Sequence, residues 1–432
     1  MSSDRIALVV AVALLAALPC AGPTTERVTG SWSGRPERGW RGRAHLTADG
    51  RFVTFDSESD DLVPNDGNRF EDVFVRDRST GAIEIASLDS SGRPGNGHSF
   101  SGSTSGDGRF VAFASRADDL VRGDMNGVCD VFVHDRSNGA TTLVSALPSG
   151  VQGNGDSTDP VISDDGRFVA FVSVASNLDV HDTSSISDVF VANLMTRQIR
   201  CVSLTPRGRS GNHGSGVWGG PSISADGQVV AFASGADDLV AHDHNLYWDV
   251  FVRDLGTGQT RRVDVGRLGG EANYGAEYPS ISADGQVVAF ESFSWNLVAG
   301  DTNRLYDVFV FDLRSGVTER VSVDSSGAQA KGGGGGPTLS PNGNVVAFTS
   351  SSDDLVPGDN NDCQDAFVHD RTTGLTERVS VDTQGNEVRD SSDTYRLRAV
   401  SSDGGIVGFE SESDAFVSGD WNRSNDVFIR VR

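Results

Sequence analysis

The sequence predicts an all-β fold, a seven-bladed β-propeller of four-stranded antiparallel blades, because one unit is repeated along its whole length. Seven copies run through the 432 residues, each marked by an Asp-Gly or Asn-Gly turn beginning at Asp49, Asp107, Asp165, Asp226, Asp284, Asn342 and Asp403. Successive turns are 58 or 61 residues apart. A fixed period of this size is typical of architectures in which each unit buries its faces against its neighbours.

The fifth repeat shows how one unit is expected to fold. Four short runs rich in Val, Ile and Phe are separated by Gly, Asp, Asn and Ser, a pattern typical of strands and hairpins. They cover residues 280–282, 286–291, 307–311 and 318–323. The second and third runs are almost continuously apolar, as expected of strands buried on both faces. Such four-stranded sheets, stacked face to face around an axis, form a propeller.

The two ends of the chain predict how the ring closes. The seventh repeat stops at Arg432 without a fourth strand, whereas residues 25–30 match the fourth strands that contain Thr318 and Thr376. We therefore expect residues 25–30 to pair with residues 426–432, which would remove two exposed strand edges. With no linker-like change in composition between repeats, residues 23–432 are expected to form one propeller domain.

Three motifs recur in the repeat: a Ser-x-Asp-Gly turn, an apolar second strand ending in Phe-x-Ser, and an Asp-Val-Phe-Val-x-Asp third strand. In these the chain resembles the TolB-type, WD40-like propeller repeat of bacterial envelope and secreted proteins, over residues 25–432. The resemblance implies the fold and no particular activity. TolB itself has six blades and an additional N-terminal domain, so its contact with the peptidoglycan-associated lipoprotein is not carried over.

The N-terminal segment predicts export. Residues 6–18 are almost wholly apolar and are followed by small residues, so residues 1–22 are expected to be a cleaved signal peptide. The apolar run is shorter than the roughly 20 residues that span a bilayer. Pro19, directly before Cys20, argues against a lipoprotein. We expect a periplasmic or extracellular protein with no membrane span after cleavage.

The composition of the chain limits the kinds of partner that it is expected to bind. The net charge of -24 arises from 36 basic and 60 acidic side chains, which disfavours nucleic acid because phosphate binding needs basic residues. It favours solubility or attraction of cations. Cys129, Cys201 and Cys363 lie at non-equivalent positions and do not form a disulfide framework. Stacked blades need no partner for folding, so a monomer is expected.

The long loop before each third strand carries the most regular acidic motif. Every repeat has an Asp six residues before the Asp that opens the strand, and Asn follows the first Asp by two residues except at Ser184. Such oxygen ligands suit Ca²⁺, which takes six to eight of them, whereas capping of turns by Asp and Asn needs no metal. Both interpretations stay open. Repeat three, with Ser184, and repeat seven, with Ala415 at a further acidic position, suit a metal least. The candidate calcium ligands are Asp66, Asn68, Asp72, Asp124, Asn126, Asp130, Asp243, Asn245, Asp249, Asp301, Asn303, Asp307, Asp359, Asn361, Asp365, Asp420, Asn422 and Asp426.

Two further sets are expected on the same long-loop face, where binding residues concentrate on a rigid scaffold. The histidines of repeats three and four could hold a transition metal or be ordinary surface residues; they are His181, His213, His242 and His244. Non-repeated aromatic and arginine residues suit a sugar or an acidic peptide, or pack the loops; they are Trp40, Phe100, Trp218, Tyr274, Tyr278, Tyr395, Arg396 and Arg398.

Catalytic signatures are missing from the sequence: there is no Gly-x-Ser-x-Gly elbow and no His-Glu-x-x-His. Chemistry normally needs one asymmetric site, whereas the acidic pairs are repeated. The first expectation is therefore a secreted or periplasmic, non-enzymatic propeller that binds a protein or glycan, steadied by Ca²⁺. The alternative is a metal-dependent polysaccharide lyase or hydrolase on a TolB-like propeller, which would use the histidine cluster and a metal.

Overall fold

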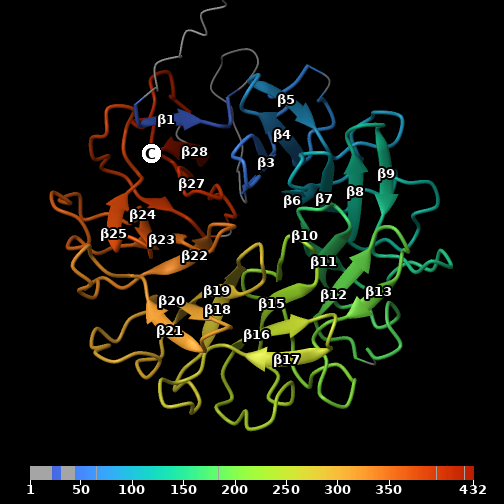
Figure 1. The fold of residues 1–432 in the computed structure, drawn as a ribbon. Coiled ribbons are helices and arrows are strands. Elements are labelled where there is room, and N and C mark those ends of the chain that lie inside the picture. The colour runs from blue at the N-terminus through green and yellow to red at the C-terminus, as the bar shows by residue number, and fades with distance from the viewer. Residues whose placement is uncertain (1–21, 31–43, 65, 183, 396, 423) are drawn as a thin grey trace, which may run out of the picture.

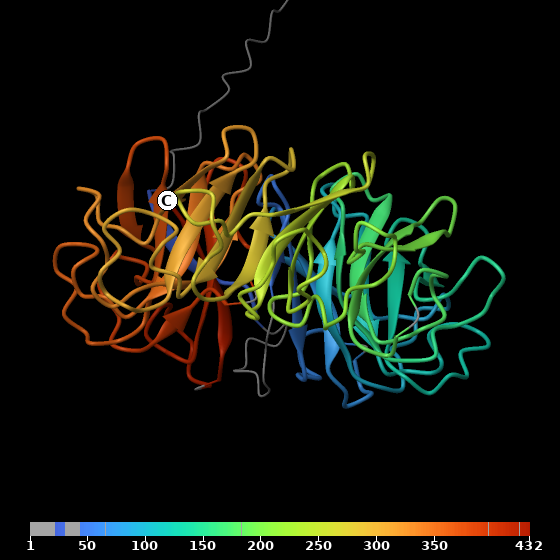
Figure 2. The ribbon, with the colours of Figure 1, turned by 90° about the horizontal axis from the view of Figure 1, so that it is seen from below.

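The computed structural model describes residues 22–30, 44–64, 66–182, 184–395, 397–422 and 424–432. In these residues 28 strands form seven four-stranded antiparallel sheets. The sheets stand as blades around a central axis, as the ring in Figure 1 and the flattened disc in Figure 2 show. The predicted seven-bladed propeller is confirmed. Apart from Gly22, the predicted signal peptide lies outside the described residues, among which no helix is long and apolar enough to cross a membrane.

Each blade runs from an innermost first strand at the axis to an outer fourth strand. The first strands are β2 (His45–Leu46), β6 (Ser99–Thr104), β10 (Ser157–Ile162), β14 (Ser222–Ile223), β18 (Ala276–Ile281), β22 (Gly335–Leu339) and β26 (Ser392–Asp393). The second strands are β3 (Phe52–Ser57), β7 (Phe110–Ser115), β11 (Phe168–Ser173), β15 (Val229–Ser234), β19 (Val287–Ser292), β23 (Val345–Ser350) and β27 (Ile406–Ser411). The third strands are β4 (Asp72–Asp77), β8 (Asp130–Asp135), β12 (Asp188–Asn193), β16 (Asp249–Asp254), β20 (Asp307–Asp312), β24 (Asp365–Asp370) and β28 (Asp426–Val431). The fourth strands are β5 (Ala82–Ile85), β9 (Ala140–Leu143), β13 (Ile199–Cys201), β17 (Gln259–Arg262), β21 (Val317–Arg320), β25 (Leu375–Arg378) and, for blade 7, β1 (Thr24–Arg27).

In the fifth blade two predicted strand boundaries are displaced. Strand β18 begins at Ala276, before the predicted start at residue 280, because a β-bulge between Glu277 and Ser280 lets pairing with β19 continue. Strand β21 ends at Arg320 because Val323, predicted to lie in it, forms a separate bridge with Gln329.

The ring closes as predicted. Strand β1 pairs antiparallel with β28, from Thr24 opposite Val431 to Arg27 opposite Phe428. The N–H of Val28 continues the ladder by donating to the carbonyl of Val427 at 2.8 Å. The N-terminal segment is therefore the fourth strand of blade 7, and neither strand is left as an open edge on this side.

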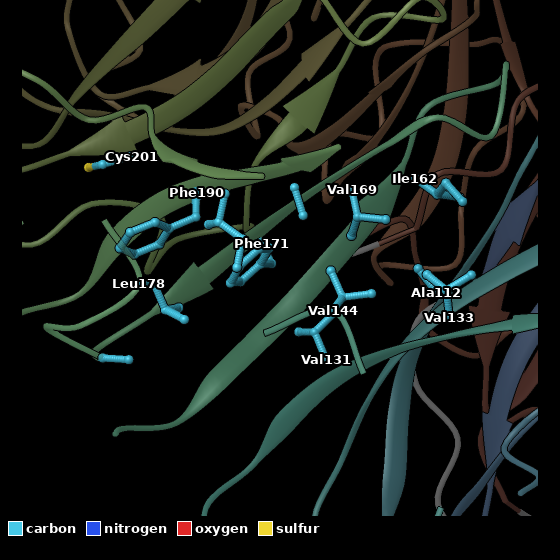
Figure 3. Close-up of a cluster of buried hydrophobic side chains, with 13 residues drawn as sticks. Ala112, Val131, Val133, Val144, Ile162, Val169, Phe171, Leu178, Phe190 and Cys201 are labelled. Atoms are coloured by element: carbon cyan, nitrogen blue, oxygen red, sulfur yellow. The ribbon is translucent and has the colours of Figure 1, made fainter. Parts of the chain in front are cut away.

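The core lies between adjacent blades. In every blade a phenylalanine of the second strand stacks on one of the third strand, with ring centroids 5.5 to 6.0 Å apart. Figure 3 shows Phe171 and Phe190 of blade 3 in one cluster with Val131 and Val133 of blade 2. Buried Ala112 leaves room for this approach of the two sheets. Because the apolar contacts cross from blade to blade, the stability of each blade depends on its neighbours.

A bulge in four innermost strands shapes the mouth of the central channel on the long-loop face. Ser101, Asp159, Tyr278 and Gly336 occupy equivalent places and have φ values of 59°, 53°, 53° and 58°. Register shifts at these places are found in the first strands of blades 2, 3, 5 and 6. A bulge re-aims the side chains beside it, so the mouth of the channel differs from blade to blade although the sheets do not.

Candidate functional site

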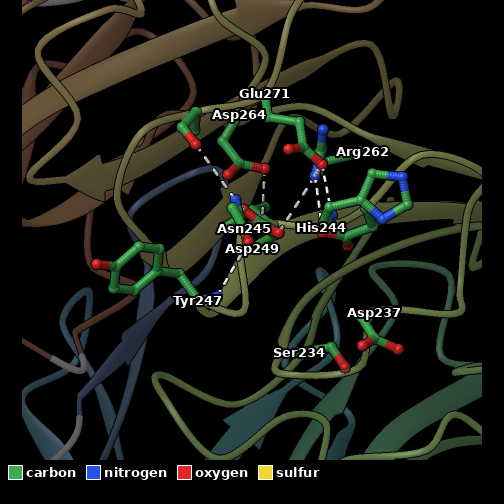
Figure 4. A network of polar contacts seen from close by, with 12 residues as sticks. Ser234, Asp237, His244, Asn245, Tyr247, Asp249, Arg262, Asp264 and Glu271 are labelled. Atoms are coloured by element: carbon green, nitrogen blue, oxygen red, sulfur yellow. Dashed lines mark hydrogen bonds and ion pairs between the residues drawn. The ribbon is translucent and has the colours of Figure 1, made fainter.

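The acidic loops act first as turn caps. In blade 4, shown in Figure 4, Asn245 Nδ2 donates to Asp249 Oδ1 at 3.0 Å and to the carbonyl of Ala272 at 3.3 Å, while Asn245 Oδ1 accepts the N–H of Tyr247. The same Asn to Asp hydrogen bond recurs in four other blades: Asn68 to Asp72, Asn126 to Asp130, Asn361 to Asp365, and Asn422 to Asp426. In blade 5 Gln329 donates to Asp307 instead, and Asn303 donates to the carbonyl of Ala330.

Four blades also pair an arginine with the acidic loop, in blades 4, 5 and 6 with both aspartates and in blade 7 with the first. In blade 4 Arg262 Nη1 lies 3.0 Å from Asp243 Oδ1 and 3.4 Å from Asp249 Oδ2. The equivalent ion pairs are Arg320 with Asp301 and Asp307 at 3.7 and 3.9 Å, Arg378 with Asp359 and Asp365 at 3.1 and 3.5 Å, and Arg27 with Asp420 at 2.8 Å. In blades 4 to 7 a guanidinium thus occupies the space in which the sequence suggested a calcium ion.

Blades 1 to 3 lack this arginine. The residue opposite the third-strand phenylalanine is Arg262 in blade 4 but Ile85, Leu143 and Cys201 in blades 1, 2 and 3. Burial raises the pKa of the strand-opening aspartates there, to about 7 at Asp72 and Asp188 and to about 6 at Asp130. The described residues contain no group of three or more His, Cys, Asp or Glu that could hold a metal ion.

The histidines named from the sequence do not converge. The rings of His242 and His244 lie 6.2 Å apart, but His181 Nδ1 is paired with Asp179 at 2.7 Å and His213 Nδ1 contacts Asn212 at 3.2 Å. Their loops belong to neighbouring blades, yet each ring has a local partner. These side chains therefore do not supply the donor set of a transition-metal centre.

The non-repeated aromatic residues do gather at the channel mouth and on the rim of blades 4, 5 and 7. Tyr278 meets Tyr395 edge to face at 5.3 Å, and Tyr274 packs on Phe293 at 5.0 Å. Further pairs are Tyr247 with Tyr274 at 5.4 Å, Phe293 with Tyr306 at 5.5 Å, and Trp218 with Trp248 at 6.5 Å. Trp218, Tyr247, Tyr274 and Tyr306 are between 37% and 45% exposed, so part of each side chain is accessible from solvent.

Two glutamates that were missed in the sequence lie beside these rings. Glu277 in β18 is directly opposite Glu291 in β19, an arrangement of like charges that destabilises a sheet. Glu291 Oε2 accepts the N–H of Gly336 at 2.7 Å and hydrogen-bonds the Tyr395 hydroxyl. Burial, followed by the charge of Glu277, raises the pKa of Glu291 to about 7.

Glu277 is the accessible member of the pair, because it is half-buried, whereas Glu291 is only 4% exposed. Burial raises the pKa of Glu277 as well. At the equivalent second-strand position, blades 1 and 7 also carry a carboxyl, Asp56 and Glu410, whereas blades 2, 3, 4 and 6 carry Ala114, Val172, Ala233 and Thr349. This position alone therefore does not single out Glu291, and blade 7 also has an acidic cross-strand pair, Asp393 opposite Glu410.

Arg398, the other predicted arginine, lies on the channel wall. Its guanidinium donates to the carbonyl of Pro221 and to Ser222 Oγ, which joins blade 7 to blade 4. Its charge adds to burial in lowering the pKa of His45 to about 3. Arg398 therefore has a structural role, because it links two blades.

Of the other residues predicted for this face, Phe100 is in β6 and half-buried, whereas Trp40 and Arg396 lie outside the described residues.

Comparisons with known proteins agree with the fold. No protein-family model matches the chain. Dipeptidyl-peptidase 5 of Porphyromonas gingivalis is 31% identical over 101 residues, which cover 23% of this chain and only 14% of that protein. A solved oligogalacturonate lyase in complex with manganese is 13% identical, with a TM-score of 0.54 over 96% of this chain and 94% of its own. An oligogalacturonate lyase from Vibrio parahaemolyticus is 12% identical, with a TM-score of 0.52 over the same shares.

The propeller domain of the Trilobed protease from Pyrococcus furiosus is 10% identical and has a TM-score of 0.53 over 91% of this chain and 94% of its own. Solved TolB proteins also match. The chain is a seven-bladed propeller, as predicted. At these identities the likeness to solved structures shows the fold alone.

The expectation of a non-enzymatic binding scaffold was wrong. Proteins with the same architecture over nearly the whole chain are oligogalacturonate lyases, and the curated relative is a peptidase. Catalytic motifs and the repeated acidic pairs do not reveal groups that break the symmetry of the repeat. The asymmetric groups instead come from a cross-strand pair and from loops of different blades. Metal binding is compatible with this fold, since one neighbour is a manganese complex, but the histidines here do not form such a centre.

Proposed function

We propose that this propeller is a polysaccharide-cleaving enzyme whose active site is the channel mouth of blades 4, 5 and 7. The observation that carries the proposal is the Glu277–Glu291 pair, placed among open aromatic rings. Aromatic faces with a few convergent polar groups are typical of small-ligand and sugar sites. A titratable pair with raised pKa values in such a place is a catalytic candidate.

In this proposal Glu277 transfers the proton. It is accessible, and burial raises its pKa toward the range in which a carboxyl works best as a general acid. Hydrolysis and elimination both need such a proton donor or acceptor at the glycosidic bond. Glu291 is a positioning residue, because its hydrogen bonds hold the Tyr395 ring and the Gly336 bulge. Tyr278 and Tyr274 would stack on sugar rings.

The charge of the chain bears on the substrate. A net charge of -24 repels a polyanionic chain unless cations screen it. Both neutral polysaccharides and uronic-acid polymers therefore belong in the test, the latter with and without Ca²⁺. We also propose that the protein works as a monomer outside the cytoplasm, in the periplasm or beyond, since residues 6–18 have the pattern of an export signal.

The test is turnover of a polysaccharide panel by wild type and by Glu277→Gln. New reducing ends report any cleavage, and ultraviolet-absorbing unsaturated ends report elimination. Removal of a general acid or base is expected to lower the rate by about 10²- to 10⁴-fold. Glu58→Gln, an exposed glutamate of blade 1, is the matched control. Absence of cleavage across the panel, or full activity of Glu277→Gln, would refute the proposal.

A further inference from the structure

Blade 3 departs from the other blades at its acidic loop. In the loops of blades 4 to 7 an arginine is ion-paired with the first aspartate, and in three of them with the second as well. In blades 1 and 2 an asparagine amide covers the strand-opening aspartate at 2.7 Å. Blade 3 has neither device, because Ser184 replaces the asparagine and Cys201 replaces the arginine.

The result is a pair of buried carboxylates with open oxygens. Asp182 is 3% exposed and Asp188 is 0% exposed, and the Oδ2 atoms of both have no hydrogen-bond partner among the described residues. Their Oδ1 atoms are occupied, by the N–H of Ser184 at 3.0 Å and by the hydroxyl of Ser203 at 2.5 Å respectively. The hydroxyls of Ser184 and Ser210 lie near these carboxylates without bonding the two open oxygens.

A buried carboxylate oxygen without a partner is costly, and a pair of them costs more because the charges repel. In blades 4 to 7 the guanidinium of an arginine offsets this cost by pairing with the carboxylates. Asp182 and Asp188 are close enough for the charge of each to act on the Cys201 thiol, which stands where the guanidinium stands elsewhere. The arginine positions of the other blades therefore show where a cation would lie in blade 3.

We propose that blade 3 binds one Ca²⁺ ion between Asp182 and Asp188, at the place that an arginine guanidinium occupies in blades 4 to 7. Two carboxylates balance the charge of a divalent ion, and nearby serine hydroxyls and water supply further hard oxygen ligands of the kind that Ca²⁺ prefers. A transition metal, which favours nitrogen and sulfur donors, fits less well: although Cys201 is near, the described residues contain no group of three or more His, Cys, Asp or Glu that could hold a metal ion. The repeat that seemed among the least suited from its sequence thus has an open oxygen on both aspartates of its loop, whereas in blade 1 the open oxygen is on Asp66 alone.

The experiment measures Ca²⁺ binding to the mature protein after EDTA treatment and dialysis, by titration calorimetry and by thermal unfolding. Wild type is expected to bind one equivalent and to show a saturable rise in Tm. Cys201→Arg supplies the guanidinium of the other blades, so it should abolish binding and keep Tm in EDTA at or above that of wild type. Asp188→Asn should abolish binding as well.

Leu143→Arg, the same change at the same place in blade 2, is the matched control and should leave the blade 3 equivalent of Ca²⁺ bound. The proposal is overturned if neither Ca²⁺ binding nor a shift in Tm is found, since the pair then shares a proton. It is equally overturned if Cys201→Arg binds Ca²⁺ as wild type does, or if Mn²⁺ or Zn²⁺ binds in preference to Ca²⁺. Because Cys201→Arg is expected to fold, the outcome does not depend on the stability of the aspartate variant.

Discussion

Replacing Arg378 by methionine tests whether the arginines hold the acidic loops together. Arg378 Nη1 lies 3.1 Å from Asp359, 3.5 Å from Asp365 and 2.8 Å from Glu387. The side chains of Arg378, Asp359 and Asp365 are 10%, 4% and 1% exposed, so the ion pair is shielded from water. Methionine keeps most of the packing of the stem and removes the charge.

Removal of one partner of a buried ion pair costs about 3–5 kcal/mol, because the other charge stays buried alone. At roughly 2.1 cal/mol/K of unfolding entropy per residue, a propeller of about 400 residues loses about 4–6 °C of Tm for this change. The assay is chemical and thermal unfolding at pH 7 in EDTA. Arg314→Met is the control, since Arg314 and Asp284 form an exposed pair at 2.8 Å and such pairs contribute about 0–1 kcal/mol.

The pH dependence of this variant has a defined sign. Burial raises the pKa of Asp359 to about 6 and raises that of Asp365, while the charge of Arg378 lowers both. Without Arg378 these pKa values rise further, so both carboxyls are protonated more readily in the folded state. The destabilisation of Arg378→Met is therefore largest above pH 7 and shrinks as the pH falls toward 5. A loss below about 1 kcal/mol at pH 7, or a loss independent of pH, would refute the reasoning.

Three further outcomes are expected. The pKa of Glu291 is raised from 4.5 to about 7, so its contribution to stability is present below about pH 4.5 and lost as the pH rises through 7. Glu291→Gln should therefore flatten the pH dependence of the free energy of unfolding in urea over that window. An unchanged pH profile would count against this pKa shift. Deletion of residues 22–30 exposes the edge of β28 and should lower Tm and cause concentration-dependent association in size-exclusion chromatography, whereas a monomer of wild-type Tm would show that closure is dispensable. Tyr278 has a φ of 53°, a strained value for tyrosine, and the equivalent residue of the next blade is Gly336 with a φ of 58°. Tyr278→Gly should therefore keep the free energy of unfolding within about 1 kcal/mol of wild type while polysaccharide cleavage is lost. Retained cleavage would remove Tyr278 from the proposed site.

The acidic loops show how far a sequence pattern carries. The Asp and Asn spacing correctly places a polar turn before every third strand, because such turns are local and depend on a few consecutive residues. It does not reveal what fills the space between the aspartates. Arg262 reaches Asp243 from the fourth strand, and that contact depends on the register between β16 and β17. The sequence shows that the arginine is present, but not that its guanidinium lies beside the aspartates.

The number of blades, the four strands of each blade and the closure of the ring could all be predicted from the sequence. These follow from a regular period, from turn residues and from apolar runs, all of which act over short stretches of chain. Which side chains meet could not be predicted in this way, because it depends on how the blades pack in the folded ring. Glu291 is bound by Gly336 of the next blade and by Tyr395 of the blade beyond, while Asp182 and Asp188 are left with open oxygens. A propeller brings distant repeats to one axis, and there a bulge or a single replaced residue makes equivalent positions chemically different.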